Sequence, residues 1–149
     1  MLIEYRISYQ NAHTLKAEEL ARLFDSSGIR RPTDDLDRIQ KMIDHASLIV
    51  TAWQIADEDQ SENAVRSAER LVGIARALTD FSFACYLSDL AVDRDIQRQG
   101  IGRELVQKVH AAIGEESMLL LLAAPEAMDY YPRIGFDPVA NGWIIKRVH

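Results

Sequence analysis

Hydrophobic and polar positions divide the first third of the chain into one strand and two helices. Residues 2–9 alternate apolar and polar side chains, as a strand with one buried face does. We expect a helix next, capped at its start by Thr14 and ended by Gly28. Its apolar stripe consists of Ala17, Leu20, Ala21 and Phe24. A second helix should begin at Thr33 or Asp34, and its apolar face consists of Leu36, Ile39 and Ile43.

The middle of the chain contains three apolar segments that predict consecutive strands. They span residues 46–55, 71–78 and 83–92. The charged residues 57–63, between the first two strands, predict a solvent-exposed turn.

The last third returns to an alternation of helix and strand. Apolar residues at helical spacing begin at Ile101, and Gly114 ends this helix. Residues 118–122 are continuously apolar, which is typical of a strand buried on both faces. Residues 125–131 predict a short helix, and residues 143–148 predict a last strand.

The order of these elements predicts the fold class. Strands joined by short turns should run antiparallel, because a parallel connection needs a dozen or more residues. The strand–helix–strand unit around residue 100 should form a parallel, right-handed crossover. We therefore expect an α/β fold, with one mixed sheet and helices on both faces, in a single domain that spans residues 1–149.

Charge and cysteine content narrow the function classes. The formal net charge of -6 disfavours nucleic acid as a partner, because phosphate binding needs a basic surface. The single cysteine, Cys85, cannot form an internal disulfide, and its apolar neighbours are typical of a small core residue. The four histidines lack ligand spacing, so we expect no metal. With no secretion signal or membrane-spanning segment in the sequence, we expect a cytoplasmic protein.

Two glycines, Gly100 and Gly102, separate a predicted strand from the start of a helix. The first N–H groups of a helix have no partners within it, and the helix dipole is positive at that end. Such a turn is suited to bind phosphate. Two phosphate motifs do not fit here. No Lys-Ser/Thr pair follows the glycines as in a P-loop, and Leu105 replaces the third glycine of a dinucleotide-binding turn.

Three segments carry a resemblance to one known family. Gln97-Arg98-Gln99-Gly100-Ile101-Gly102 fits the Gln/Arg-x-x-Gly-x-Gly/Ala signature of the GNAT superfamily, the acyl-CoA-dependent N-acetyltransferases. Leu90-Ala91-Val92, followed by a charged turn, resembles the fourth strand of that fold. The segment 130–136 resembles its Tyr-x-x-x-Gly-Phe element, and a helix and a strand separate the two motifs as in the family.

The resemblance implies transfer of an acetyl group from acetyl-CoA to the primary amine of an unidentified small-molecule or peptide acceptor. The amine would attack directly in a ternary complex, because Cys85 is poorly suited to relay the group. Leu90 and Val92 would bind the cofactor through main-chain hydrogen bonds, and the glycine turn would bind its pyrophosphate. The expected cofactor-binding residues are Leu90, Ala91, Val92, Gln97, Arg98, Gln99, Gly100, Ile101, Gly102 and Arg103. Residues 122–127 lack the asparagine that many family members use for the cofactor, which leaves the backbone as the main partner.

Two residues are candidates for the chemistry. Tyr131 matches the family's tyrosine four residues before Gly-Phe and would protonate the leaving thiolate, with packing against the cofactor as the alternative. Asp89 is the candidate general base, unless the alternation of side chains turns it away into an ion pair. Arg30 and Arg31 either bind an acidic group of the acceptor or lie in a solvated loop. A non-catalytic acyl-CoA sensor is the alternative function, and the family also allows a homodimer.

Overall fold

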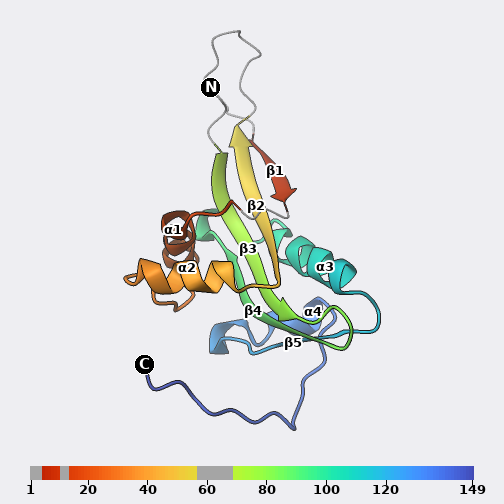
Figure 1. Cartoon of the computed structure of the whole chain (residues 1–149). Coiled ribbons are helices and arrows are strands. Elements are labelled where there is room, and N and C mark those ends of the chain that lie inside the picture. The colour runs from red at the N-terminus through yellow and green to blue at the C-terminus, as the bar shows by residue number, and fades with distance from the viewer. Residues whose placement is uncertain (1–4, 11–13, 57–68) are drawn as a thin grey trace.

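The chain folds around one five-stranded sheet. A computed structural model describes residues 5–10, 14–56 and 69–149 (Figure 1). The strands lie side by side in chain order. The first four pair antiparallel and β5 pairs with β4 in parallel. For the strands from β2 to β5 this is the arrangement that the connection lengths predicted. The strands are β1 (Tyr5–Gln10), β2 (Leu48–Ala56), β3 (Glu69–Thr79), β4 (Ala84–Val92) and β5 (Met118–Leu121).

Helices cover both faces of the sheet, which confirms the predicted α/β class (Figure 1). The apolar stripes of α1 and α2 pack on one face, and that of α3 packs on the other. Within the described residues, no helix is long and apolar enough to cross a membrane. The helices are α1 (Ala17–Ser27), α2 (Leu36–Asp44), α3 (Ile101–Ile113) and α4 (Tyr130–Arg133), with 3-10 turns η1 (Arg94–Ile96) and η2 (Pro125–Ala127).

The first two helices differ from the prediction at their starts. Thr14 does not cap α1, which begins at Ala17 with Lys16 in the capping position and no side-chain hydrogen bond there. Thr14 lies two residues too early for its hydroxyl to reach the first-turn N–H groups. In α2 the cap is Asp35, whose carboxylate accepts from the Arg38 N–H at 3.0 Å. The predicted end of α1 is confirmed, because Gly28 adopts the left-handed conformation there with φ of 84°.

Close packing of α3 on the sheet depends on Gly73 in β3. A Cβ atom at this position would lie 3.1 Å from Leu105 Cδ1 and 3.2 Å from Ile101 Cγ2 of α3. Ala52 of β2 crowds the same point at 3.2 Å. A residue without a side chain is therefore needed where the helix crosses the strand.

The predicted last strand at residues 143–148 is wrong. These residues form no strand in the structure and are exposed to solvent. Their β-forming side chains satisfy the local preference, but a strand also needs a neighbour to pair with. The predicted helix at 125–131 also differs, since it divides into η2 and α4. The predicted charged turn at 57–63 lies outside the described residues.

Candidate active site

Strands β4 and β5 diverge and leave a pocket between them. Their parallel pairing ends at Leu87 and Leu121, whereas β4 continues to Val92. The pocket has a volume of about 490 Å³. Its walls come from β4, the chain after β5, the end of α1 with its following loop, and α4. The lining residues that matter most below are Arg31, Ser88, Leu90, Val92, Gln97 and Tyr131.

Leu90 and Val92 direct their main-chain N–H and C=O groups away from β3, on the pocket side of β4. The Asp93 N–H donates to the carbonyl of Val72 opposite it at 2.8 Å, so these two residues form a hydrogen-bonded pair. Hydrogen-bonded and non-hydrogen-bonded pairs alternate along an antiparallel ladder. Val92 and Leu90 are therefore non-hydrogen-bonded positions with respect to β3, and Ala91 between them bonds to β3. A second extended chain could pair with this side of β4, where the Val92 carbonyl also accepts from Gln97 Nε2.

A bulge at Ser88 decides which way the acid in β4 points. The register between β3 and β4 slips by one residue at this position. Leu87 before the bulge packs in the core layer under α3, and so does Leu90 after it. Asp89 therefore faces the opposite layer, on the side of α1 and α2. Without the bulge, Asp89 would share the face of Leu87.

Asp89 is fully buried, and two arginines share its carboxylate. Arg31 Nε donates to Oδ1 at 2.6 Å, and Arg76 Nε donates to Oδ2. Arg31 Nη2 also donates to the Ser88 carbonyl at 2.8 Å, and Arg76 Nη2 donates to the Ser88 hydroxyl at 3.0 Å. Arg31 is thus fixed to β4 rather than solvated, and Asp89 is engaged in ion pairs on both of its oxygens.

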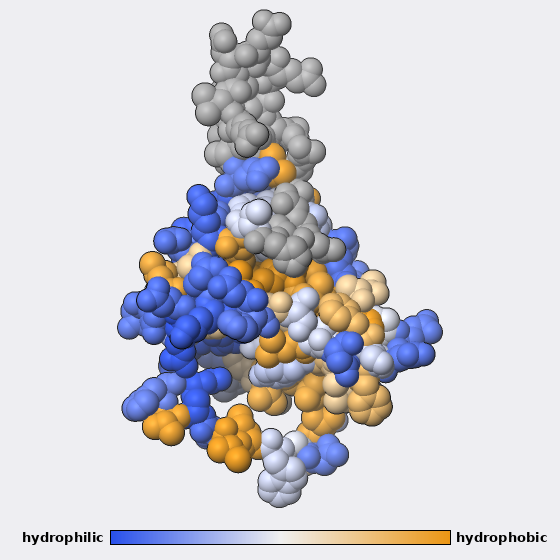
Figure 2. All heavy atoms as spheres, viewed as in Figure 1, coloured by the Kyte–Doolittle hydropathy of each residue, from blue (hydrophilic) through white to orange (hydrophobic). Residues whose placement is uncertain are grey.

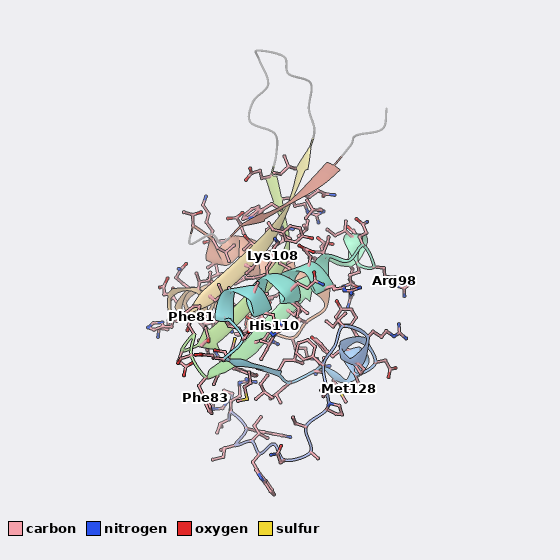
Figure 3. All side chains as sticks on the ribbon, turned by 90° about the vertical axis from the view of Figure 1, so that its right-hand side faces the viewer. Phe81, Phe83, Arg98, Lys108, His110 and Met128 are labelled. Atoms are coloured by element: carbon pink, nitrogen blue, oxygen red, sulfur yellow. The ribbon has the colours of Figure 1, made fainter. Side chains whose placement is uncertain are left out.

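The turn between β4 and α3 contains two residues in the left-handed conformation. Arg98 and Gly100 both have positive φ, 70° and 80°. Successive residues of opposite handedness can turn their main-chain N–H groups toward one point, where an anion can bind. Gly100 is the N-cap of α3, and because it has no side chain it cannot cap the N–H groups of the first turn. Gln97 Nε2 donates to the Val92 carbonyl at 2.9 Å and ties the turn to the end of β4. Figure 3 shows Arg98 on this turn, beside the start of α3.

Gly102 lies directly beneath a tyrosine of α4. A Cβ atom at Gly102 would lie 2.7 Å from the hydroxyl oxygen of Tyr130. The absence of a side chain at residue 102 leaves room for an oxygen atom against the first turn of α3. Burial raises the pKa of Tyr130, and nearby Arg103 lowers it to a smaller extent.

Tyr131 reaches the pocket from α4. Its ring packs edge-on against Phe136 and Tyr130, with centroids 5.5 and 5.3 Å apart. Burial raises the pKa of the Tyr131 phenol, Tyr130 shifts it in the same direction, and the positive charge of Arg31 opposes both. The phenol is therefore protonated at neutral pH and able to donate a proton to a group in the pocket.

The structure brings most of the predicted site together. Leu90, Ala91, Val92, Gln97 and Tyr131 line the pocket, and residues 98–103 form the adjoining turn and helix start. Sequence reasoning missed Arg76 and the fixed position of Arg31. A signal for Arg76 existed, because a charged residue within an apolar strand needs a buried partner. No group of three or more metal-ligating side chains is found in the part of the chain that the structure describes.

Comparison with known proteins identifies relatives along most of the chain. The model of the acetyltransferase (GNAT) domain matches residues 32–143. The N-acetyltransferase ycf52 of Porphyra purpurea is 31% identical over 135 residues, which cover 86% of this chain and 70% of that protein. The chloroplastic GCN5-related N-acetyltransferase 2 of Arabidopsis thaliana is 27% identical, over 91% of this chain and 55% of its own length. The histone acetyltransferase TAP1 of Glycine max is 25% identical, over 92% and 58%.

Solved structures share the fold. A GNAT-family acetyltransferase of Streptococcus pneumoniae superposes with a TM-score of 0.65 at 21% identity, covering 97% of this chain and all of that one. An aminoglycoside N-acetyltransferase solved with CoA gives a TM-score of 0.59 at 14% identity, covering 100% and 98%. The diverging strands β4 and β5, the glycine turn and the matching domain model all indicate the same family. The chain belongs to the GNAT family and is an acetyltransferase of that kind.

Proposed function

We propose that this enzyme moves an acetyl group from acetyl-CoA to the primary amine of an acceptor while both are bound. The observation that carries the proposal is the pocket where β4 and β5 diverge. There the main-chain groups of Leu90 and Val92 point away from β3 and can pair with an extended chain. The pantetheine arm of coenzyme A carries amide groups and would add to β4 as another strand would.

The turn before α3 fits the other end of the same molecule. Its positive-φ residues, Arg98 and Gly100, present N–H groups at a helix start, where anions bind well. At Gly102 one oxygen atom, the Tyr130 hydroxyl, already lies within 2.7 Å of the point that a Cβ atom would occupy. Arg98 and Arg103 add positive charge for a pyrophosphate. The pocket and the turn adjoin through Gln97, so one ligand could occupy both.

Tyr131 is our candidate for the catalytic acid. Bound acetyl-CoA supplies a thioester that an amine can attack and a sulfur that leaves as a thiolate. Tyr131 is protonated at neutral pH, because a phenol pKa ordinarily lies near 10 and burial raises it further, and it would donate that proton to the sulfur. The positive charge of Arg31 would stabilise the phenolate that remains, and the phenolate would regain its proton from the nitrogen that becomes the amide, directly or through water. Cys85 is buried in the core with a raised pKa, which supports direct transfer to the amine rather than relay through the thiol.

For Asp89 we propose a positioning role in place of a general base. Both of its carboxylate oxygens hold arginines, so neither is free to take a proton from the acceptor. The carboxylate instead fixes Arg31 beside the pocket. The acceptor ammonium would then lose its proton to water before attack.

The names of related proteins suggest classes of amine that the acceptor could belong to. Named relatives and neighbours include a histone acetyltransferase, an aminoglycoside acetyltransferase and a glucosamine-6-phosphate acetyltransferase. The net charge of -6 gives a weak preference for cationic acceptors. A suitable panel therefore contains a lysine peptide, an aminoglycoside and an amino sugar.

Calorimetry with coenzyme A, ATP and NAD tests the proposal. We expect coenzyme A to bind and the other two to give no heat, because the pocket favours an amide-containing arm. Absence of coenzyme A binding would overturn the proposal. Release of free thiol from acetyl-CoA across the amine panel then separates an enzyme from a sensor, since a sensor would bind and release none.

A further inference from the structure

Two arginines line one wall of the pocket, where the end of α1 meets the end of β4. Arg31 lies in the loop after α1, and Arg94 lies in η1, just after β4. Among the described residues that line the pocket, the one other charged side chain is Glu126 of η2, in the chain after β5. Figure 2 shows hydrophilic residues gathered over α1 and α2, on the same side of the sheet as Arg31. The wall between α1 and β4 is therefore polar and positively charged.

Gly28 lets the Arg94 guanidinium lie against the end of α1. A Cβ atom at Gly28 would lie 2.8 Å from Cζ and 3.0 Å from Nε of Arg94, so the guanidinium could not occupy this position beside another residue. The Arg94 side chain is exposed, and it makes no hydrogen bond or ion pair with another described residue. Its five N–H donors are therefore available to a ligand.

Arg31 contributes a second positive charge to this wall. Arg31 and Arg76 share the single carboxylate of Asp89, so two positive charges and one negative charge leave one positive charge in excess. Arg76 is buried, whereas Arg31 lines the pocket and presents the excess charge to it. Three N–H groups of Arg31 donate to the Asp89 carboxylate and to two main-chain carbonyls. An arginine has five such groups, so two remain for a ligand.

The arginine wall lies close to the proposed site of the chemistry. The charge of Arg31 acts on the Tyr131 phenol and lowers its pKa, against the larger effect of burial. Residues 28–31 join the Arg94 contact to Arg31, a span of at most about 11 Å between Cα atoms. The pocket of about 490 Å³ must also hold the arm of the cofactor, which leaves space for a small acceptor. The net charge of -6 belongs to the whole chain, whereas the field inside a cleft depends mainly on the charges that line it.

We propose that the acceptor is a small amine that also carries an oxyanion group, a carboxylate or a phosphate, and that Arg31 and Arg94 bind this group. The proposal rests on the acetyl transfer proposed above and names the class of its acceptor. A planar guanidinium matches two oxygen atoms of a carboxylate or a phosphate, and the anion would balance the excess positive charge of the wall. The amine at the other end of the acceptor would then lie toward Tyr131 and the thioester.

Matched pairs of acceptors test the proposal through release of free thiol from acetyl-CoA. One pair is γ-aminobutyrate and its amide, and the other is glucosamine-6-phosphate and glucosamine. We expect the anionic member of at least one pair to have a kcat/KM higher by about tenfold or more, because hydrogen bonds to a charged group are strong. Equal values within both pairs, or turnover of the neutral members or the lysine peptide alone, would overturn this inference and leave the proposed function standing. Lack of coenzyme A binding would instead contradict the proposed function itself.

Arg94→Gln distinguishes an anion of the acceptor from a phosphate of the cofactor. We expect the ratio of kcat/KM for the anionic and neutral members to fall by about tenfold, while the Kd of coenzyme A stays at the parental value. The matched control is Arg38→Gln, which removes the same charge from an exposed position of α2 outside the pocket and should keep the parental ratio. Weaker coenzyme A binding with an unchanged ratio would assign Arg94 to the cofactor. No change in either value would leave Arg94 only a packing contact of Gly28, and each of these two results would overturn the proposal.

Discussion

The ion pairs of Asp89 with Arg31 and Arg76 provide the sharpest test of how the site is supported. Asp89→Asn keeps the shape of the side chain and removes its charge. Arg76 is only 7% exposed, so its guanidinium would stay buried without a counter-charge. Arg31, 26% exposed, can turn toward water and should contribute less to the loss.

The expected cost follows from that burial. Removing one partner of a buried ion pair lowers the free energy of unfolding by about 3–5 kcal/mol. Arg76 would keep hydrogen bonds to the Ser88 hydroxyl at 3.0 Å and the Met42 carbonyl at 3.4 Å, which favours the lower end, about 3 kcal/mol. With an m-value of about 2 kcal/mol/M, the urea midpoint should fall by about 1.5 M.

Urea unfolding followed by circular dichroism measures this loss. The matched control is Glu104→Gln, which removes an exposed ion pair to Lys108 at 3.5 Å and should cost less than about 0.5 kcal/mol. A loss below about 1 kcal/mol for Asp89→Asn would show that Arg76 does not depend on this carboxylate as its buried counter-charge. Unchanged stability together with lost turnover would instead restore Asp89 as a general base.

Three further predictions follow from packing and from pKa shifts. Gly73→Ala should lower the free energy of unfolding by about 1–3 kcal/mol, because its Cβ would crowd α3; thermal unfolding measures this, and an unchanged midpoint would contradict it. Turnover should fall as pH rises above the raised pKa of Tyr131, because the phenolate cannot donate; a pH profile with no alkaline decline would exclude its acid role. The pKa of Asp80 is lowered from 3.8 to about 2 by N–H groups of Phe83, Ala84 and Ser82, so its contribution to stability is lost as pH falls through that range. Asp80→Asn should flatten the melting temperature between pH 4 and 2, and a parent-like slope would argue against this linkage.

Signals confined to neighbouring residues predicted much of the fold. The left-handed conformations at Gly28 and Gly100 follow from the absence of a side chain, and both glycines mark helix ends in the structure. The short turn between β3 and β4 predicted antiparallel pairing, and the long connection through α3 predicted parallel pairing of β4 with β5. The motif 97–102 placed the turn beside the pocket, although contact with a cofactor stays a prediction.

Features that depend on distant residues were not predictable. The bulge at Ser88 turns Asp89 to the other face of the sheet, and no periodicity in β4 indicates it. Arg31 lies 58 positions from Asp89, and a loop residue gives no local sign of such a partner. The strand predicted at 143–148 fails for the same reason, because β-propensity does not show whether a neighbouring strand is present.

The most direct test of proton donation by Tyr131 compares acetyl-CoA turnover by the parent and by Tyr131→Phe, using an amine that the parent accepts. The measurement is release of free thiol, with coenzyme A affinity determined on the same samples. We predict that turnover falls by about 10²–10⁴-fold while affinity is unchanged, because the ring stays and only the proton donor is lost. Equal turnover by the two proteins would contradict the assignment of Tyr131 as the catalytic acid.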